Sequence, residues 1–360
     1  MTGLYLHIPY CASRCNYCDF YSAGGSHGVP DAYLDALLRE LTRFVENGAA
    51  TKFDTLYFGG GTPSLLTPLQ VKRLIEAVQF VPNAEITLEA NPETVTQKLL
   101  WDFRAAGVNR ISFGVQTAFD KSLARLGRRH TAQQSRDAMC FAREAGFANI
   151  SGDLMLALPD YTVAELTATL DLLEQGGCTH VSSYLLKIEP KTVFGMHAPE
   201  HLPDADAAAD FYLEAVAALA ARGYVQYEIS NFAKPHFAGQ HNLLYWNCEN
   251  YLGLGPVAHS CLAEKRFATP SGTAAFLAAP TIYEPQGIVT ATDYIMLQLR
   301  LASGLSLRLL QEKYNVVFSQ KQQNFLQALC KNGMARLEND VLTLTPKGML
   351  LQNSILCELI

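Results

Sequence analysis

The sequence has no apolar run close to the roughly 18 residues that a membrane-spanning helix requires. It also lacks an excess of basic residues, because its net charge at pH 7 is −6. Proteins that bind nucleic acid present a basic surface, so this charge balance argues against nucleic acid as a partner. The first residues carry no charged-then-apolar leader, which predicts a cytoplasmic protein whose membrane contact is at most transient.

The chain has nine cysteines, an odd number, so they cannot all pair in disulfides. A reducing cytoplasm also disfavours disulfides. Three of them, Cys11, Cys15 and Cys18, have the spacing C-x3-C-x2-C with no fourth cysteine nearby. Structural zinc uses four ligands, and bacterial ferredoxins use C-x2-C-x2-C-x3-C, so neither pattern fits. The three thiolates predict a [4Fe-4S] cluster with one iron left open for a small ligand.

Short strand-like runs alternate with helical patterns along the first half of the chain. We expect strands at residues 3–8, 54–58, 85–89, 109–114, 149–155 and 179–186. The helical patterns between them cover 31–46, 68–80, 94–106, 120–126, 133–145 and 162–175. Strand-then-helix repetition requires a parallel sheet with helical crossovers. Six such units predict an α/β fold, an open partial (β/α)6 barrel rather than a closed one of eight.

Three regions are expected along the chain. Residues 1–225 form the partial barrel, and 226–288 form a loop-rich extension with many aromatic, glycine and proline residues. The pattern of residues 289–360 predicts three helices and a short hairpin. Together these elements would form a small C-terminal winged-helix-like α+β domain. This last region has no basic recognition helix, so we expect it to cover or dock rather than to bind DNA.

Polar residues follow several of the expected strands. Glycines 59–61 and Thr62 come after the second strand, and Glu89, Gln116 and Asp153 come after later ones. Arg128 lies just beyond the helix that follows Gln116. Ligands of parallel sheets sit beyond the C-terminal strand ends, so these residues are candidate ligand contacts. The alternative for each is a helix cap or a surface ion pair.

The C-x3-C-x2-C motif followed by Gly59-Gly60-Gly61-Thr62-Pro63 resembles the radical S-adenosylmethionine (SAM) superfamily. Within it the chain is similar to the coproporphyrinogen oxidase-like branch, and most similar to haem chaperones of the HemW type. The resemblance implies that the open iron binds SAM and that an electron donor protein supplies the electron that cleaves SAM to a 5′-deoxyadenosyl radical. By the same resemblance, the residues that contact SAM are Tyr5, Gly60, Gly61, Thr62, Glu89, Gln116, Arg128 and Asp153.

The run from His241 to Trp246 matches the His-Asn-x-x-Tyr-Trp motif of the haem chaperones. A histidine can ligate haem iron, and tyrosine and tryptophan can stack on a porphyrin. From composition alone the segment reads as a packed aromatic loop, and it is the resemblance that favours haem. The resemblance implies a haem site at His241, Tyr245 and Trp246, and haem-acceptor proteins as partners.

Two departures separate the chain from anaerobic coproporphyrinogen III oxidases. Those enzymes carry a fourth cysteine where this chain has Phe20, and a longer arm before the cysteines, whereas only ten residues precede Cys11. The expected function is therefore a haem chaperone that carries a [4Fe-4S] cluster and SAM. Two alternatives stay open: a radical SAM enzyme of porphyrin metabolism (the oxidase or a haem-modifying methyltransferase), and an iron–sulfur protein with no haem role. The sequence leaves open whether SAM is cleaved.

Overall fold

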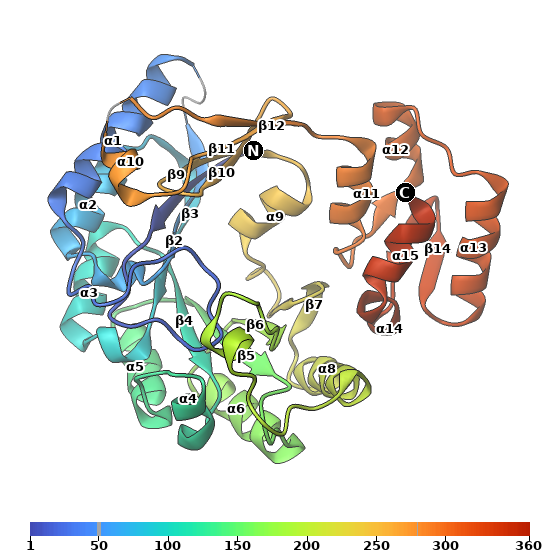
Figure 1. The fold of residues 1–360 in the computed structure, drawn as a ribbon, viewed down its shortest axis with the longest axis horizontal. Helices are drawn as coiled ribbons and strands as arrows, with labels where there is room; N and C mark the ends of the chain where they lie inside the picture. Colours follow the sequence, from blue (N-terminus) through green and yellow to red (C-terminus); the bar gives the residue numbers. More distant parts are fainter. Residues whose placement is uncertain (49–51, 279) are drawn as a thin grey trace.

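The computed structural model describes residues 1–48, 52–278 and 280–360. All six expected strands are present, and each pairs in parallel with the next. They are β1 (Thr2–Ile8), β2 (Phe53–Gly60), β3 (Phe80–Ala90), β4 (Arg110–Gln116), β5 (Asn149–Leu156) and β6 (His180–Leu185). The prediction of an α/β fold built on a parallel, open barrel is confirmed (Figure 1).

Helices cross over between these strands, as parallel pairing requires. They are α1 (Asp31–Glu46), α2 (Pro68–Glu76), α3 (Gln97–Ala106), α4 (Asp120–Arg125), α5 (Ala132–Glu144) and α6 (Val163–Gln175). Thr67 and Thr131 start α2 and α5 with capping boxes, which satisfy backbone N–H groups that the first helical turn leaves free. Gly107 ends α3 at φ +116°, a conformation that favours glycine. The helix expected at 68–80 ends earlier, at Glu76.

Residues 226–288 contain more regular structure than the loop-rich stretch expected there. They include β7 (Val225–Glu228), β8 (Asn231–Ala233), α9 (Gln240–Trp246), β9 (Asn250–Leu254), β10 (His259–Leu262), β11 (Lys265–Ala268), α10 (Thr273–Leu277) and β12 (Glu284–Ile288). These strands extend the sheet at both edges, in the order β12-β11-β10-β9-β1-β2-β3-β4-β5-β6-β8-β7. β9 lies parallel to β1, so the segment adds a seventh parallel strand beside the cysteine-bearing end of the barrel.

Alternation along β1 divides the sheet into two faces. Leu4, Leu6 and Ile8 are at most 1% exposed and belong to the large core shared with the helices. Tyr5 and His7 point the other way, and the Tyr5 ring stacks on Tyr57 of β2 with 6.1 Å between centroids. The inner face of the barrel is therefore aromatic and polar near β1.

The C-terminal residues form a separate module with its own hydrophobic core. It holds α11 (Ala291–Gln298), β13 (Leu305–Ser306), α12 (Leu307–Tyr314), α13 (Gln320–Lys331), β14 (Ala335–Glu338), β15 (Val341–Leu344), α14 (Pro346–Leu350) and α15 (Gln352–Leu359). A short helix, α7 (Val193–Met196), and a long one, α8 (Ala205–Ala221), precede β7. Figure 1 shows the module beside the barrel, with α11 nearest to α9.

Several polar contacts join the module to the barrel and its extension, among them the ion pairs Arg300–Glu228, Arg266–Asp293 and Lys313–Glu264. Arg300 pairs with the fully buried carboxylate of Glu228 at 3.0 Å, and Gln298 donates to the Trp246 carbonyl at 2.9 Å. A buried carboxylate without its partner is costly, so the first contact fixes the module firmly. Over the described residues, no helix is both long and apolar enough to cross a membrane.

Candidate functional site

One cavity at the C-terminal ends of β1–β5 gathers ten of the eleven residues expected around the cluster and SAM. They are Cys11, Cys15, Cys18, Gly60, Gly61, Thr62, Glu89, Gln116, Arg128 and Asp153. The eleventh, Tyr5, lies elsewhere and is described below. These residues come from five neighbouring parallel strands, β1 to β5, and from the segments that follow them, so the convergence comes directly from the barrel topology.

The glycines after β2 hold the cysteine loop against the barrel. The Gly61 N–H donates to the Ile8 carbonyl, and the Thr62 N–H donates to the Tyr10 carbonyl, both at 2.8 Å. A side chain at Gly61 would lie 2.7 Å from the Tyr10 carbonyl oxygen, inside any tolerable contact. Glycine at this position therefore lets the loop that carries the three cysteines lie directly on the strand end.

The three cysteines form no disulfide, and donors approach two of their sulfurs. Thr62 Oγ1 donates to Cys11 Sγ at 3.5 Å, and Arg128 Nη1 donates to Cys15 Sγ at 3.6 Å. Hydrogen bonds to ligand sulfurs are among the features by which a protein tunes the reduction potential of an iron–sulfur cluster. In the described residues no three His, Cys, Asp or Glu side chains converge around a single ion. The three cysteines line one cavity, and three thiolates are the donor set that fits a [4Fe-4S] cluster with one open iron.

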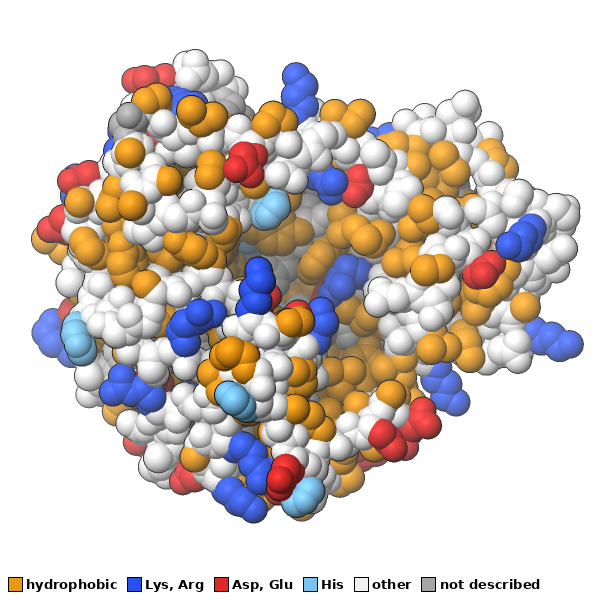
Figure 2. Space-filling view, viewed as in Figure 1, with side chains coloured by type: hydrophobic (Ala, Val, Ile, Leu, Met, Phe, Trp, Pro, Cys, Tyr) orange, Lys and Arg blue, Asp and Glu red, His pale blue; other side chains and the backbone are white. Residues whose placement is uncertain are grey.

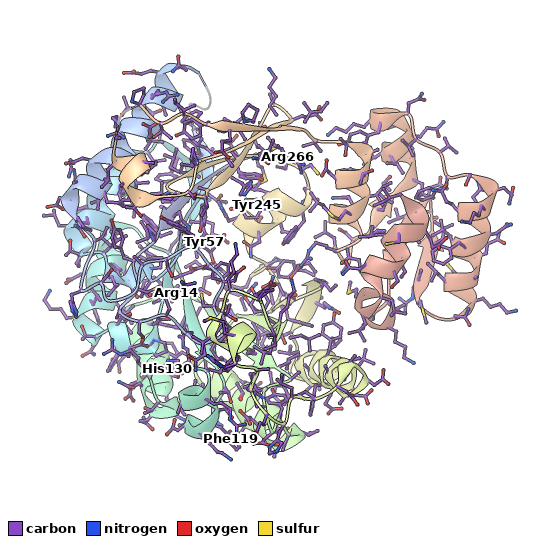
Figure 3. The ribbon with its side chains drawn as sticks, viewed as in Figure 1. Arg14, Tyr57, Phe119, His130, Tyr245 and Arg266 are labelled. Carbon is purple, nitrogen blue, oxygen red and sulfur yellow. The ribbon has the colours of Figure 1, made fainter. Side chains whose placement is uncertain are left out.

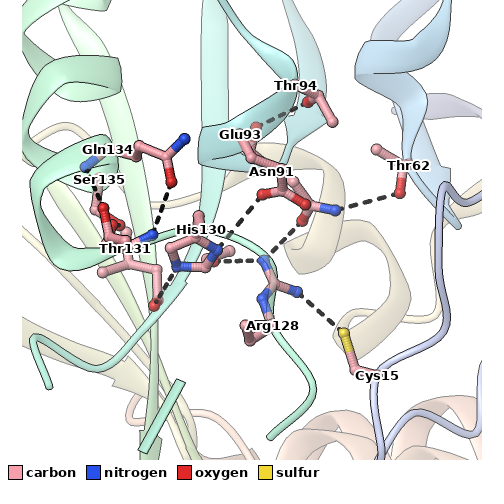
Figure 4. Close-up of polar contacts among 12 residues, drawn as sticks. Cys15, Thr62, Asn91, Glu93, Thr94, Arg128, His130, Thr131, Gln134 and Ser135 are labelled. Carbon is pink, nitrogen blue, oxygen red and sulfur yellow. Dashed lines mark hydrogen bonds and ion pairs between the residues drawn. The ribbon is translucent and has the colours of Figure 1, made fainter. Parts of the chain in front are cut away.

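Arg128 connects the cysteine loop to two strand ends (Figure 4). Its Nη2 donates to the Asn91 side-chain oxygen at 2.8 Å and to the Gly114 carbonyl at 2.6 Å. Its Nε is buried and has no hydrogen-bond partner among the described residues, so the guanidinium keeps one donor that is not yet used. The neighbouring Arg129 is exposed, so Arg128 is the arginine that the cavity receives.

Glu89 and Asp153 place two half-buried carboxyl groups in the same cavity. Burial raises the pKa of Glu89 to about 7, although Tyr57 donates to it at 2.8 Å and the Gly60 N–H at 3.1 Å. Burial likewise raises the pKa of Asp153 to about 6. A cationic ligand would draw both groups into their ionised form, so the site suits an ammonium or sulfonium.

Two further features of the cavity bear on binding. Gln116 is 6% exposed and adopts φ +67°, a conformation uncommon for a non-glycine residue and frequent at functional sites. Asn91 lines the cavity and donates to Thr62 Oγ1 at 3.3 Å, although we did not predict a role for it. Its place directly after the third strand, two residues from Glu89, was the available signal.

A second cavity, of about 430 Å³, opens between β1, α9 and the C-terminal module. Tyr5, Tyr245 and Trp246 line it, so Tyr5 lies with the expected haem residues rather than with the cysteines. Figure 2 shows the molecule hollowed between barrel and module, with hydrophobic side chains around the hollow. In Figure 3 Tyr245 and Arg266 lie on the side of the barrel that faces the module.

His241 does not line this cavity; it lies beneath it and is 1% exposed. Its Nδ1 is hydrogen-bonded to Thr55 Oγ1 at 2.6 Å and its Nε2 to the Tyr245 hydroxyl at 2.7 Å. Burial lowers the pKa of His241 to about 3, so the imidazole is neutral. Both ring nitrogens therefore hold neighbouring side chains, and the histidine reaches the cavity only through Tyr245.

Known proteins resemble this chain over nearly its whole length. The Radical SAM superfamily model matches residues 5–173, and the HemN C-terminal domain model matches 289–351. The haem chaperone HemW of Bacillus subtilis is 33% identical, covering 99% of this chain and 98% of its own. The chain belongs to the HemW family. HemW of Escherichia coli is 42% identical over 71% of this chain and 69% of its own.

A solved structure supports the fold of this HemW-family chain. The structure of coproporphyrinogen III oxidase (HemN) from Escherichia coli, a radical SAM enzyme, matches it with a TM-score of 0.84 at 23% identity. The match covers 99% of this chain and 89% of the oxidase. The HemW and radical SAM assignments made from the cysteine and glycine motifs are thus confirmed. When bound, a [4Fe-4S] cluster with an open iron supplies one electron to a ligand on that iron.

Proposed function

We propose that this chain binds haem and delivers it to acceptor proteins. The observation that carries the proposal is its similarity, from end to end, to HemW proteins that are named haem chaperones. The aromatic cavity beside α9 supports it, because a porphyrin needs a concave, mostly apolar site with a few polar groups. Tyr245 and Trp246 of the predicted haem set line that cavity.

We further propose that Cys11, Cys15 and Cys18 hold a [4Fe-4S] cluster and that SAM occupies the adjoining cavity. Arg128 would pair with the SAM carboxylate, and Glu89 and Asp153 would accept from its ammonium or ribose hydroxyls. The unpartnered Nε of Arg128 and the shared cavity support this arrangement. An electron donor protein is the implied third partner, since the cluster must be reduced from outside.

We also propose where the protein works and which partners it meets. A reducing cytoplasm preserves thiolates and iron–sulfur clusters, so we place the protein there. The net charge of −6 gives no reason to include nucleic acid among its partners. Contact with a membrane would be transient and would serve delivery to a membrane-bound acceptor.

An enzyme of porphyrin metabolism is the second candidate, because the chain shares its fold with coproporphyrinogen III oxidase. Phe20 argues against that reaction, since those oxidases carry a cysteine at the matching position. Phe20 is 70% exposed at the cavity edge, so its side chain is free to meet a ligand.

One anaerobic experiment separates the candidates. The reconstituted protein is mixed with SAM, dithionite and either haem or coproporphyrinogen III, and 5′-deoxyadenosine and porphyrins are followed by mass spectrometry. A carrier binds haem stoichiometrically and returns it chemically unchanged to an acceptor such as an apo-cytochrome. Catalytic loss or alteration of the porphyrin, with matching 5′-deoxyadenosine, would make the protein an enzyme instead.

A further inference from the structure

Three histidines lie in or against the aromatic cavity, and only one is available to a metal. His7 has Nδ1 hydrogen-bonded to the Tyr5 hydroxyl at 3.0 Å and Nε2 to the Tyr21 carbonyl at 2.9 Å. His241 is occupied at both nitrogens, as described above. His259 lines the cavity, is exposed, and makes no ring hydrogen bond within residues 1–48, 52–278 and 280–360. A neutral imidazole with a free nitrogen is the side chain that haem iron prefers.

The hairpin that carries His259 also carries a cation for the same cavity. β10 and β11 pair antiparallel, with His259 opposite Ala268 and Cys261 opposite Arg266. Directly opposed residues share a face, and so do residues two apart, so His259 and Arg266 lie on one face of the hairpin. Both line the cavity.

Arg266 has unused hydrogen-bonding capacity. Its Nη1 donates to Asp293 Oδ1 at 2.8 Å, while its Nε is buried without a partner among the described residues. A buried donor left unpaired costs free energy that a ligand acceptor would recover. Haem carries two propionate carboxylates, and arginine is the side chain best suited to bind a carboxylate.

The turn before β10 adds a third sign of a binding site. Val257 lines the cavity at φ +59°, a left-handed conformation that is a genuine outlier for a β-branched residue. Such strain persists only where surrounding structure imposes it, and it concentrates at ligand sites. Met296 and Leu297 of α11 close the opposite side, so the complete cavity requires the C-terminal module.

We propose that haem seats in this cavity with His259 as the protein ligand to iron and Arg266 paired with a propionate. The proposal rests on the haem binding proposed above and names the residues that achieve it. Tyr245 and Trp246 provide the aromatic wall, and His241 is a positioning residue that holds the Tyr245 hydroxyl. The motif histidine therefore shapes the site from below, and a histidine 18 residues further along the chain binds the metal.

The test is a haem titration of the full-length, cluster-reconstituted protein, followed by the Soret band. His259→Ala should shift the Soret band and weaken haem binding at least tenfold, and free imidazole added to this variant should restore the band position. His236→Ala removes an exposed histidine outside the cavity and should leave both unchanged. His241→Gln should lower the melting temperature but keep the histidine-ligated spectrum.

Arg266 is tested with the dimethyl ester of haem, which lacks the propionate charges. Wild-type protein should prefer haem to its ester by about tenfold, the value of one charge-assisted hydrogen bond. Arg266→Gln should abolish that preference, whereas Asp293→Asn, which leaves the arginine in place, should keep it.

Two failures can be told apart. If wild-type protein binds no haem, the proposed function falls. If it binds haem, yet His259→Ala retains an unchanged Soret band while His241→Gln loses histidine ligation, the function stands and this assignment is wrong.

Discussion

The two cavities of this molecule are built in opposite ways. The cysteine-lined cavity collects residues from the C-terminal parts of successive parallel strands and from the segments that follow them. The aromatic cavity is assembled from segments as distant as β1 and α11, with two antiparallel strands between them. The first is lined by charged side chains and presents two half-buried carboxyl groups, whereas aromatic rings dominate the second. Repetitive topology creates the first site, and long-range packing creates the second.

The largest effect should come from removing one cluster ligand, which tests whether the cavities work independently. Cys15→Ser leaves two thiolates, too few to hold a [4Fe-4S] cluster of this type. We expect complete loss of the cluster's visible absorption and of reductive SAM cleavage, with haem affinity changed less than twofold.

Cys140→Ser is the matched control, because Cys140 lies on α5 away from both cavities. It should retain iron, sulfide and haem contents equal to wild type. If Cys15→Ser also abolishes haem binding while remaining folded by circular dichroism, the two sites are one functional unit.

The next largest effect should come from Glu89, whose carboxylate lines the cysteine-lined cavity and not the aromatic one. Glu89→Gln keeps the shape of the side chain but removes its charge, and a hydrogen bond to a charged group contributes about 1.5–3 kcal/mol. SAM affinity measured by calorimetry should fall roughly ten- to hundredfold. Glu144→Gln, on the exposed surface of α5, should leave SAM affinity intact. Equal affinity in wild type and Glu89→Gln would remove Glu89 from the SAM site.

Measuring SAM affinity as a function of pH tests the role of Glu89 in the wild-type protein. Burial raises the pKa of Glu89 to about 7, so the carboxyl is largely protonated at pH 6 and ionised at pH 8. A cationic ligand binds the ionised form, so SAM affinity should rise about tenfold from pH 6 to pH 8. At pH 6 the binding of SAM should release close to one proton from Glu89. In Glu89→Gln, SAM affinity should depend less on pH. A SAM affinity that falls with pH would contradict the assignment.

The difference in construction explains what could be predicted from the sequence. The cysteines, Glu89 and Asp153 could be placed together because strand order in a parallel barrel follows chain order. The edge strands could not, since β9 pairs with β1 across almost 250 residues and no local signal encodes that register. The resemblance identified the His241 motif, but only packing shows that both ring nitrogens are occupied. His259 was not among the residues predicted for the haem site, although it lies in a segment that matches the family.

Phe20 joins the cysteine-lined cavity to the aromatic cavity, because it is the one described residue that lines both. Its side chain is 70% exposed, so Phe20→Ala should change the free energy of unfolding by about 0.5 kcal/mol or less. An aromatic contact with a bound ligand contributes about 0.5–1.5 kcal/mol, so each affinity should fall roughly two- to tenfold.

The more informative readout of Phe20 is the coupling between ligands. A shared wall allows SAM to alter haem affinity, and linkage requires haem to alter SAM affinity by the same factor. Comparing haem titrations with and without SAM, in wild type and in Phe20→Ala, isolates that factor. Coupling that disappears in the variant would make Phe20 the physical contact between a site defined by topology and a site defined by packing. Coupling that survives unchanged would have to pass through β1, where Tyr5 and His7 line the aromatic cavity behind the cysteine loop.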